Sequence, residues 1–266
     1  MCHPLKEVIH KAILATMLGL LFLQIPNSMA ASATVAVASN FQRTFTALAT
    51  EFKRQSNHDL RAIISSTGVL FNQITHGAPF DVLLAADSLH PIKLEKKGFA
   101  VSGSRFTYGL GRLALVLFSQ TKQSTRKDVV VNKQRYIDQL AATTGKIAIA
   151  NPKIAPYGIA AKQTLEYLRM WQSVQPRIVM GANIAQSFQF VATGNAESGF
   201  SALSQALANE TSLSYWTVPI DWHQPILQQA ILLQSGKNNV AAIDFLAFLK
   251  KQIAITIIKS HGYNIP

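Results

Sequence analysis

The chain of 266 residues carries 25 Lys and Arg against 13 Asp and Glu, a formal net charge of +12, and 48% of its residues are hydrophobic. This length suffices for one large or two modest domains, and the charge would suit nucleic acid, a membrane surface or small anions. The basic residues stand singly or in pairs such as Lys96-Lys97, without the interleaved aromatics of a base-stacking groove, so we exclude nucleic acid and expect a general positive field that attracts anions.

The first thirty residues predict a signal peptide. Lys6 and Lys11 give a basic start, residues 12–25 are largely apolar, and Ser28-Met29-Ala30 places small residues at the −3 and −1 positions of a cleavage site. We expect cleavage after Ala30 and secretion to the periplasm; cleavage after Ala31 or an uncleaved anchor would also fit the pattern. The single cysteine, Cys2, precedes the apolar run, so we expect neither a lipid anchor nor a disulfide in the mature protein.

Strands and helices are predicted to alternate along the first half of the mature chain. Residues 34–38 predict a strand, after which Ser39-Asn40 cap a helix with an apolar stripe of Phe41, Phe45, Leu48 and Phe52. A second strand covers 60–64 and leads into a helix that ends at Gly77. We further expect a buried strand at 81–87, a helix at 88–97, and at 111–119 a long strand that passes between two lobes.

The second half continues this alternation until its end. Strands are expected at 146–150, 177–180 and 197–203, with helices at 134–141, 156–171 and 184–191. Two further strands, 213–219 and the returning 226–233, precede two closing helices at 239–250 and 252–260. The alternation predicts parallel sheets with crossover helices, and the lack of a Gly/Ser linker indicates that the chain crosses between its lobes more than once.

Three hydroxyl residues, Ser65, Ser66 and Thr67, stand where a predicted strand gives way to a helix. The first N–H groups of a helix have no intrahelical partner and carry the positive end of its dipole, so hydroxyls gathered there can form an anion site. The simpler interpretation is that Ser66 or Thr67 only caps the helix. For a lone junction of this kind we would favour the cap.

The same arrangement recurs along the chain, which favours an anion site. The four strand-to-helix junctions are Ser39-Asn40, Ser66-Thr67, Pro156-Tyr157 and Asn183-Ile184. Ligands of open α/β sheets bind at the carboxyl ends of the strands, where such junctions gather. None of the four carries a charged residue, so we expect an anion held by neutral dipoles in a cleft between two lobes.

A family resemblance extends over essentially the whole mature length. The segments that carry it, in order, are VAVASNF, SSTGVLFNQITHGAPFDVLLAAD, ANPKIAPYGIAAKQTLE and NIAQSFQFVATGNAESGFSALSQ, followed by the C-terminal IIKSHGY. In these segments the chain resembles the periplasmic molybdate-binding proteins of the molybdate ABC importers.

The resemblance implies an α/β protein with the two-lobed type II periplasmic-binding-protein fold and the ligand in the cleft between the lobes. We expect lobe 1 to comprise residues 31–112 with residues 222–266 returning to it, and lobe 2 to comprise 113–221. The implied function is capture of molybdate and tungstate by a monomer that delivers them to an ABC permease. No cofactor is implied, and molybdenum would be bound as molybdate through its oxygens rather than by direct metal ligands.

The resemblance also implies the residues that bind the oxyanion: Ser39, Asn40, Thr67, Tyr157 and Ile184. Ser39 and Thr67 would give hydroxyls, Thr67 standing where the family usually has Ser. Asn40 would give a backbone or side-chain N–H, and Tyr157 and Ile184 would act through backbone N–H groups. One branch of the family adds a Tyr hydroxyl where this chain has Ala202, so the chain resembles the branch with Asn.

An enzyme is a candidate from a different functional class. Ser39, Ser65 or Ser66 would be possible nucleophiles, but the chain has no G-x-S-x-G elbow, and His76, His90 and His223 lie in polar loop or turn contexts. We therefore expect no enzymatic activity.

A metal site finds no support in the sequence, whereas a different anion remains open as the ligand. No His/Asp/Glu cluster has metal-ligand spacing, and we expect solvated or capping roles for Asp81 and Asp87. A receptor of the same fold could bind sulfate, thiosulfate or phosphate instead of molybdate. An organic acid would call for an Arg fork, which no junction has.

Overall fold

Ten strands form two five-stranded sheets in the computed structural model of the chain, which describes residues 30–118, 133–142, 144–208 and 213–266. Most of the predicted signal peptide, residues 1–29, lies outside the described residues. The expected α/β class and the two-lobed fold are confirmed. Each lobe is built on one sheet, which joins parallel strands to antiparallel ones.

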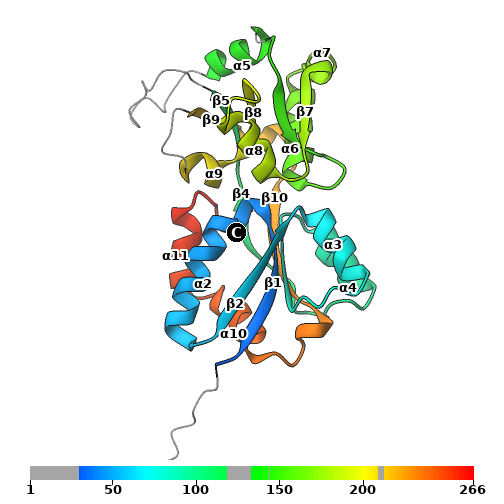
Figure 1. The fold of residues 1–266 in the computed structure, drawn as a ribbon, viewed down its shortest axis with the longest axis vertical. Coiled ribbons are helices and arrows are strands. Elements are labelled where there is room, and N and C mark those ends of the chain that lie inside the picture. The colour runs from blue at the N-terminus through cyan, green and yellow to red at the C-terminus, as the bar shows by residue number, and fades with distance from the viewer. Residues whose placement is uncertain (1–29, 119–132, 143, 209–212) are drawn as a thin grey trace, which may run out of the picture. The chain divides into compact units, whose positions relative to one another are not determined.

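The first lobe is built on a sheet of order β2-β1-β3-β10-β4 (Figure 1). Its strands are β1 (Ser32–Ala38), β2 (Asp59–Ser65), β3 (Val82–Ala85), β4 (Phe106–Gly111) and β10 (Ile226–Leu232). Strands β1, β2 and β3 run parallel, whereas β10 is antiparallel to both of its neighbours. The carboxyl ends of β1, β2 and β3 therefore lie at one edge of this sheet.

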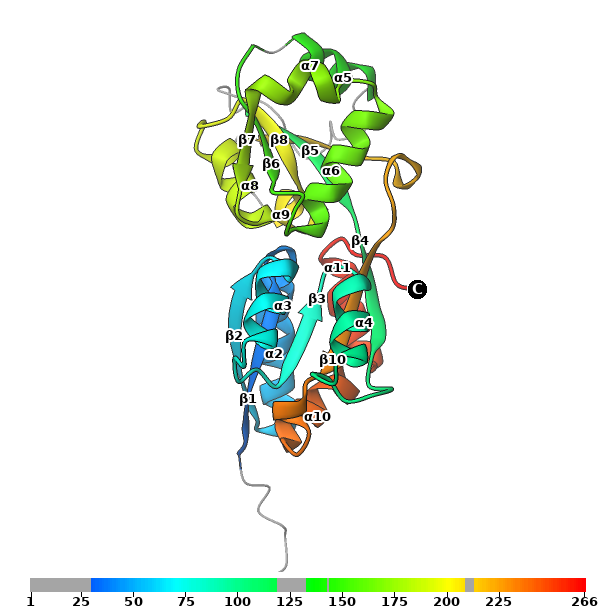
Figure 2. The same cartoon turned by 90° about the vertical axis from the view of Figure 1, so that its right-hand side faces the viewer.

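Helices cover both faces of the first sheet (Figure 2). On one face lie α2 (Gln42–Ser56), α10 (Val240–Phe248) and α11 (Gln252–Ser260), and on the other α3 (Thr67–Thr75) and α4 (Leu89–Lys96). The predicted stripe of α2 is buried with its Phe45 and Phe52 rings edge-on to Phe245 of α10. Burying such rings stabilises each by roughly 1.5–3 kcal/mol relative to exposure, which attaches the C-terminal helices to the first lobe.

The second lobe is built on a sheet of order β7-β6-β8-β5-β9. Its strands are β5 (Leu113–Phe118), β6 (Ile147–Ala150), β7 (Ile178–Gly181), β8 (Ser198–Ala202) and β9 (Leu213–Thr217). Its helices are α5 (Lys133–Ala142), α6 (Pro156–Tyr167), α7 (Trp171–Val174), α8 (Ile184–Ala192) and α9 (Leu203–Ala208). Strands β6, β7 and β8 run parallel, so a second set of strand ends lies at one edge.

One predicted helix is divided in the structure. The expected helix 156–171 ends at Tyr167, because Arg169 takes a left-handed φ of 57° and turns the chain. A separate short helix then begins at Trp171. Helix ends of this kind are decided by one residue's backbone conformation, which the apolar pattern does not report.

The chain passes between the two sheets twice. The predicted crossing run 111–119 contains the last residue of β4 and the whole of β5. These two strands belong to different sheets and are separated only by Arg112. The return runs from β9 through a single turn of 3₁₀ helix, Ile220–Trp222, to β10. Strand β10 inserts between β3 and β4, so the first sheet contains a strand from the far end of the sequence.

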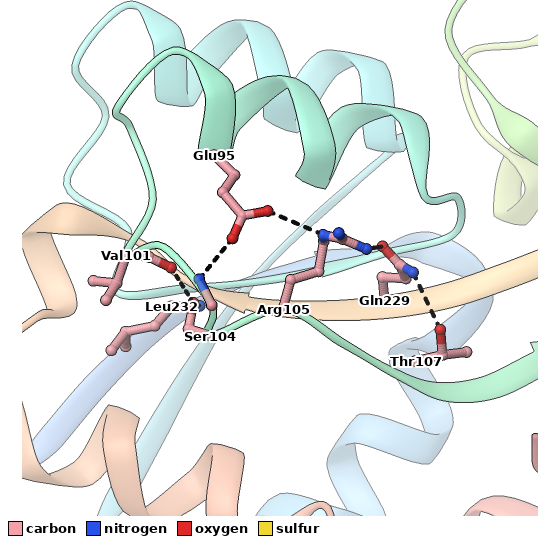
Figure 3. A network of polar contacts seen from close by, with 8 residues as sticks. Glu95, Val101, Ser104, Arg105, Thr107, Gln229 and Leu232 are labelled. Carbon is pink, nitrogen blue, oxygen red and sulfur yellow. Dashed lines mark hydrogen bonds and ion pairs between the residues drawn. The ribbon is translucent and has the colours of Figure 1, made fainter.

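A polar network fixes β10 against β4 (Figure 3). The guanidinium of Arg105 donates to Glu95 at 3.3 Å and to the side-chain oxygen of Gln229 at 3.1 Å, and Gln229 donates in turn to Thr107. The register of the two strands shifts between Gln228 and Gln229, at this network. Arg105 is therefore committed to positioning the returning strand.

None of the helices in the described part of the chain is long and apolar enough to cross a membrane.

Candidate oxyanion site

One small cavity lies where the strand ends of the two lobes meet. Its described lining comprises Ala38, Ser39, Asn40, Ser66, Thr67 and Ala86 from the first lobe and Ala155, Pro156, Tyr157 and Ile184 from the second. All five residues predicted from the sequence are in this set, and all are buried. The cavity has space for about one water molecule, so an entering ion requires the lobes to separate.

The junction after β1 differs from its prediction. We expected Ser39-Asn40 to cap a helix, but both residues lie inside a turn of 3₁₀ helix, Ser39–Phe41, that precedes α2. The residue before this turn is Ala38, which has no polar side chain with which to cap it. Ser39 and Asn40 thus stand at the first positions of a helical segment, whose N–H groups have no intrahelical partner.

The junction after β2 places two buried hydroxyls beside each other. Ser66 takes the N-cap position of α3, yet its side chain makes no capping hydrogen bond. The Thr67 side-chain oxygen accepts a hydrogen bond of 3.0 Å from the Ala86 N–H. Because Thr67 accepts there, its own hydroxyl proton is free to be donated to another acceptor.

In the second lobe the predicted donors are backbone N–H groups at helix starts. Pro156 opens α6, and Tyr157 follows it; Ile184 opens α8. The expected cap of α8 is present, since the Asn183 side chain accepts from the Gln186 N–H at 3.0 Å. The N–H groups of Tyr157 and Ile184 have no hydrogen-bond partner among the described residues.

A backbone hydrogen bond joins the lobes across the cavity. The Gly68 N–H, in the first turn of α3, donates to the Ile154 carbonyl at 2.9 Å. A Cβ at position 68 would lie 2.8 Å from that carbonyl oxygen, so only glycine allows this approach. This hydrogen bond is one of the contacts that hold the two sides of the cavity together.

A buried polar cluster holds Asn40 from behind. Its side-chain nitrogen donates to Gln228 at 3.0 Å and to the Tyr263 hydroxyl at 3.1 Å, which uses both of its amide hydrogens. The backbone carbonyl of Asn40 accepts a hydrogen bond from the Tyr263 hydroxyl at 2.8 Å and another from the Ser204 hydroxyl, in the second lobe, at 3.0 Å. Of the two N–H sources predicted for Asn40, only the backbone N–H is uncommitted.

This cluster was not predicted from the sequence. Gln228 lies on β10 and Tyr263 just after α11, both far along the chain from Asn40. The available signals were the polar pair Gln228-Gln229 inside an apolar run and the C-terminal aromatic of IIKSHGY. Neither feature of the sequence predicts which residue the side chain contacts.

The side chain of Tyr157 reaches the polar cluster around Asn40 but is not firmly bonded to it. A Cβ at Gly111 would overlap both the Tyr157 hydroxyl and the side-chain nitrogen of Gln228. The Tyr157 hydroxyl lies beside Tyr263 and Asn40 but makes no well-aligned hydrogen bond. Burial raises the pKa of Tyr157 well above its usual value, so the ring stays neutral.

The described lining of the cavity includes no charged side chain. Asp81 accepts from the Thr34 N–H at 2.7 Å, and Asp87 accepts from the His90 N–H at 2.9 Å, so each carboxylate is paired locally. No group of three or more His, Cys, Asp or Glu able to hold a metal occurs among the residues that the structure describes. Ala202 is buried at the end of β8 and is not in the described lining.

This arrangement can bind an anion that carries acceptors and no proton. Its potential donors are hydroxyls and helix N-terminal N–H groups, which come from both lobes and converge on one space. Such groups lose less free energy on burial than a charged side chain does.

The chain is similar to known solute-binding proteins. Residues 33–264 match the family described as bacterial extracellular solute-binding protein. The chain is 43% identical to the molybdate-binding protein ModA of Azotobacter vinelandii, over 90% of this chain and 92% of that protein. It is 37% identical to ModA of Rhodobacter capsulatus, over 86% of each. The solved Azotobacter vinelandii periplasmic molybdate-binding protein superposes with a TM-score of 0.78, covering 88% of this chain and 99% of that one.

The buried tyrosines predict loss of stability at alkaline pH. Burial is the main cause that raises the pKa of Tyr263 to about 12, against about 10 in an unfolded chain. The folded state holds this proton more tightly, so its contribution is complete below pH 10 and is lost as pH rises from about 10 to 12. We expect the unfolding free energy measured in denaturant to fall across that window, by roughly 1 kcal/mol per pH unit for Tyr263 alone.

Two Tyr→Phe variants test the cause. Tyr263→Phe should reduce this slope, and Tyr157 and Tyr108, whose pKa values burial also raises, should account for a remainder. Tyr167→Phe, at a side chain that is 56% exposed, should leave the slope unchanged. Equal slopes in Tyr263→Phe and wild type would contradict the assignment.

Proposed function

Because the chain belongs to the bacterial extracellular solute-binding proteins, and among them to the molybdate-binding proteins, we propose that it captures molybdate outside the cytoplasmic membrane and delivers it to an ABC permease. The observation that carries the proposal is the cavity where neutral donors of both lobes converge. We propose that tungstate is also bound, that the protein acts as a monomer without enzymatic activity, and that residues 1–30 are a cleaved signal peptide.

The proposed ligand contacts follow from the groups left uncommitted. Ser39 and Thr67 donate hydroxyl protons, and Asn40, Tyr157 and Ile184 donate backbone N–H groups. A bound oxyanion would then connect the first lobe to the second, in addition to the Gly68–Ile154 hydrogen bond. Binding therefore favours the closed arrangement, with bending at the two crossings of the chain between the lobes.

The donor-only site also predicts which anion is preferred. A fully deprotonated tetrahedral dianion presents acceptors in every direction, whereas phosphate near neutral pH keeps a proton that would face a donor. An unmatched polar pair of this kind costs about 1–3 kcal/mol, or roughly ten- to a hundredfold in affinity. Sulfate has no such proton, and its shorter bonds would stretch the hydrogen bonds to one of the lobes.

Titration calorimetry with four anions tests the proposal. We expect molybdate and tungstate to bind with similar dissociation constants, sulfate to bind much more weakly, and phosphate to bind most weakly or not at all. Sulfate within about threefold of molybdate would instead indicate a general oxyanion receptor. If none of the four anions bound, the proposed function would be wrong.

Thr67→Val and Tyr157→Phe separate hydroxyl donors from backbone donors. Thr67→Val removes a donor to a charged ligand, worth about 1.5–3 kcal/mol, and also leaves the Ala86 N–H without its partner. Tyr157→Phe removes a hydroxyl that lies beside Tyr263 and Asn40, in the polar cluster around Asn40, and keeps the backbone N–H. We expect calorimetry at a temperature where both variants are folded to show weak binding only for Thr67→Val.

Thr67→Ser is the matched control, since it keeps the hydroxyl and loses only a methyl group. Its molybdate affinity should stay within a few-fold of wild type. Equal losses in Thr67→Val and Tyr157→Phe would show that the donors are wrongly assigned.

Gly68→Ala tests whether binding requires the close approach of the lobes. The added methyl would press on the Ile154 carbonyl and break the bond between the lobes. We expect faster molybdate dissociation in stopped-flow measurements and at least tenfold weaker binding. Gly109→Ala is the control, because its Cβ would meet its nearest neighbour at an ordinary 3.5 Å within the first lobe. Unchanged dissociation in Gly68→Ala would mean that the contact does not contribute to closure.

A further inference from the structure

The hydroxyl of Ser66 lies in the cavity wall without a hydrogen-bond partner among the described residues. Its oxygen is buried, and the residue as a whole is 3% exposed. Ser66 also belongs to the cavity lining, beside Thr67 and Ser39. A buried hydroxyl without a partner is costly, so its position calls for a reason.

Helix capping does not supply that reason. Ser66 has the extended backbone of an N-cap residue, with φ −74° and ψ 152°, and an N-cap serine normally accepts from the N–H two or three residues on. No such bond is made here. The N–H two residues on belongs to Gly68, and it donates across the cavity to Ile154.

The neighbouring hydroxyl, in contrast, is already oriented. Thr67 accepts from the Ala86 N–H, which fixes its oxygen at the wall of the cavity. Thr67 thus accepts one hydrogen bond, whereas the Ser66 hydroxyl neither donates nor accepts one among the described residues. Each of the four oxygens of a tetrahedral oxyanion can accept more than one hydrogen bond, so five donors do not saturate it.

We propose that the Ser66 hydroxyl is a further donor to the bound oxyanion. The proposal rests on the function proposed above and adds to it a contact that the resemblance did not imply. It also links closure to binding. With the Gly68 N–H donated to Ile154, the Ser66 oxygen has no cap bond to that N–H to fix its position, and the hydroxyl can rotate to donate to the ligand.

The test is Ser66→Ala in the full mature chain, compared with wild type and with Ser65→Ala. Ser65 is the last residue of β2 and is outside the described lining, so it is a matched hydroxyl deletion one position away. Sodium molybdate is titrated into each protein by calorimetry, and thermal unfolding without anion is the second readout. We expect Ser66→Ala to weaken binding about ten- to a hundredfold and Ser65→Ala to stay within a few-fold of wild type.

The second readout separates a ligand contact from a structural role. Removing an unpaired buried hydroxyl should leave the unfolding temperature of the anion-free protein unchanged or raise it, whereas loss of a cap would lower it. Molybdate affinity within about threefold of wild type in Ser66→Ala overturns the proposal, whatever the unfolding temperature. If Ser66→Ala binds like wild type and wild type binds molybdate, only the role of Ser66 is wrong and the proposed function stands. If wild type binds no molybdate, the proposed function and the role of Ser66 are both wrong.

Discussion

The proposed function imposes one constraint, which is to hold an anion in a buried space whose described lining has no positively charged side chain. Helix N-terminal N–H groups and hydroxyls can do this only if they stay unpaired and are kept in position, and each such group costs free energy while it has no partner. The protein meets this constraint by placing the donors on strand ends of two separate sheets. Around Asn40, Gln228 and Tyr263 keep one of these potential donors in place.

The returning strand does most of the positioning. Strand β10 inserts between β3 and β4 and so places Gln228 within hydrogen-bond distance of Asn40. The hydrogen bond between Arg105 and Gln229 fixes the register of β10. The chain after α11 adds Tyr263, whose ring packs edge-on against Phe41 at 5.2 Å. Asn40 is thus held by groups from the far end of the sequence, and its backbone N–H is the group left for a ligand.

The N-cap position of a helix has a different role on the two sides of the cleft. Asn183 caps its helix in the ordinary way, whereas Ser66 occupies the same kind of position and caps nothing. The difference arises because Gly68 permits the second lobe to approach and take its N–H. A hydroxyl at a helix start is therefore a cap or a candidate ligand depending on what the opposite lobe presents.

The sequence by itself determined the alternation of strands and helices, the two lobes and the junctions. The spacing of apolar residues and the positions of glycine and proline set the local backbone structure through residues that are close in sequence. The sequence also determined that Ser39, Asn40, Thr67, Tyr157 and Ile184 stand at strand-to-helix junctions; the predicted parallel sheets are mixed sheets in the structure, and it is their parallel strands that bring the junctions together. Only the tertiary structure decided that Ser39-Asn40 form a 3₁₀ turn, that Ser66 lacks a partner, and that Tyr263 and Gln228 hold Asn40. These outcomes depend on contacts between residues as far apart as 223 positions, for which no local pattern specifies the partner.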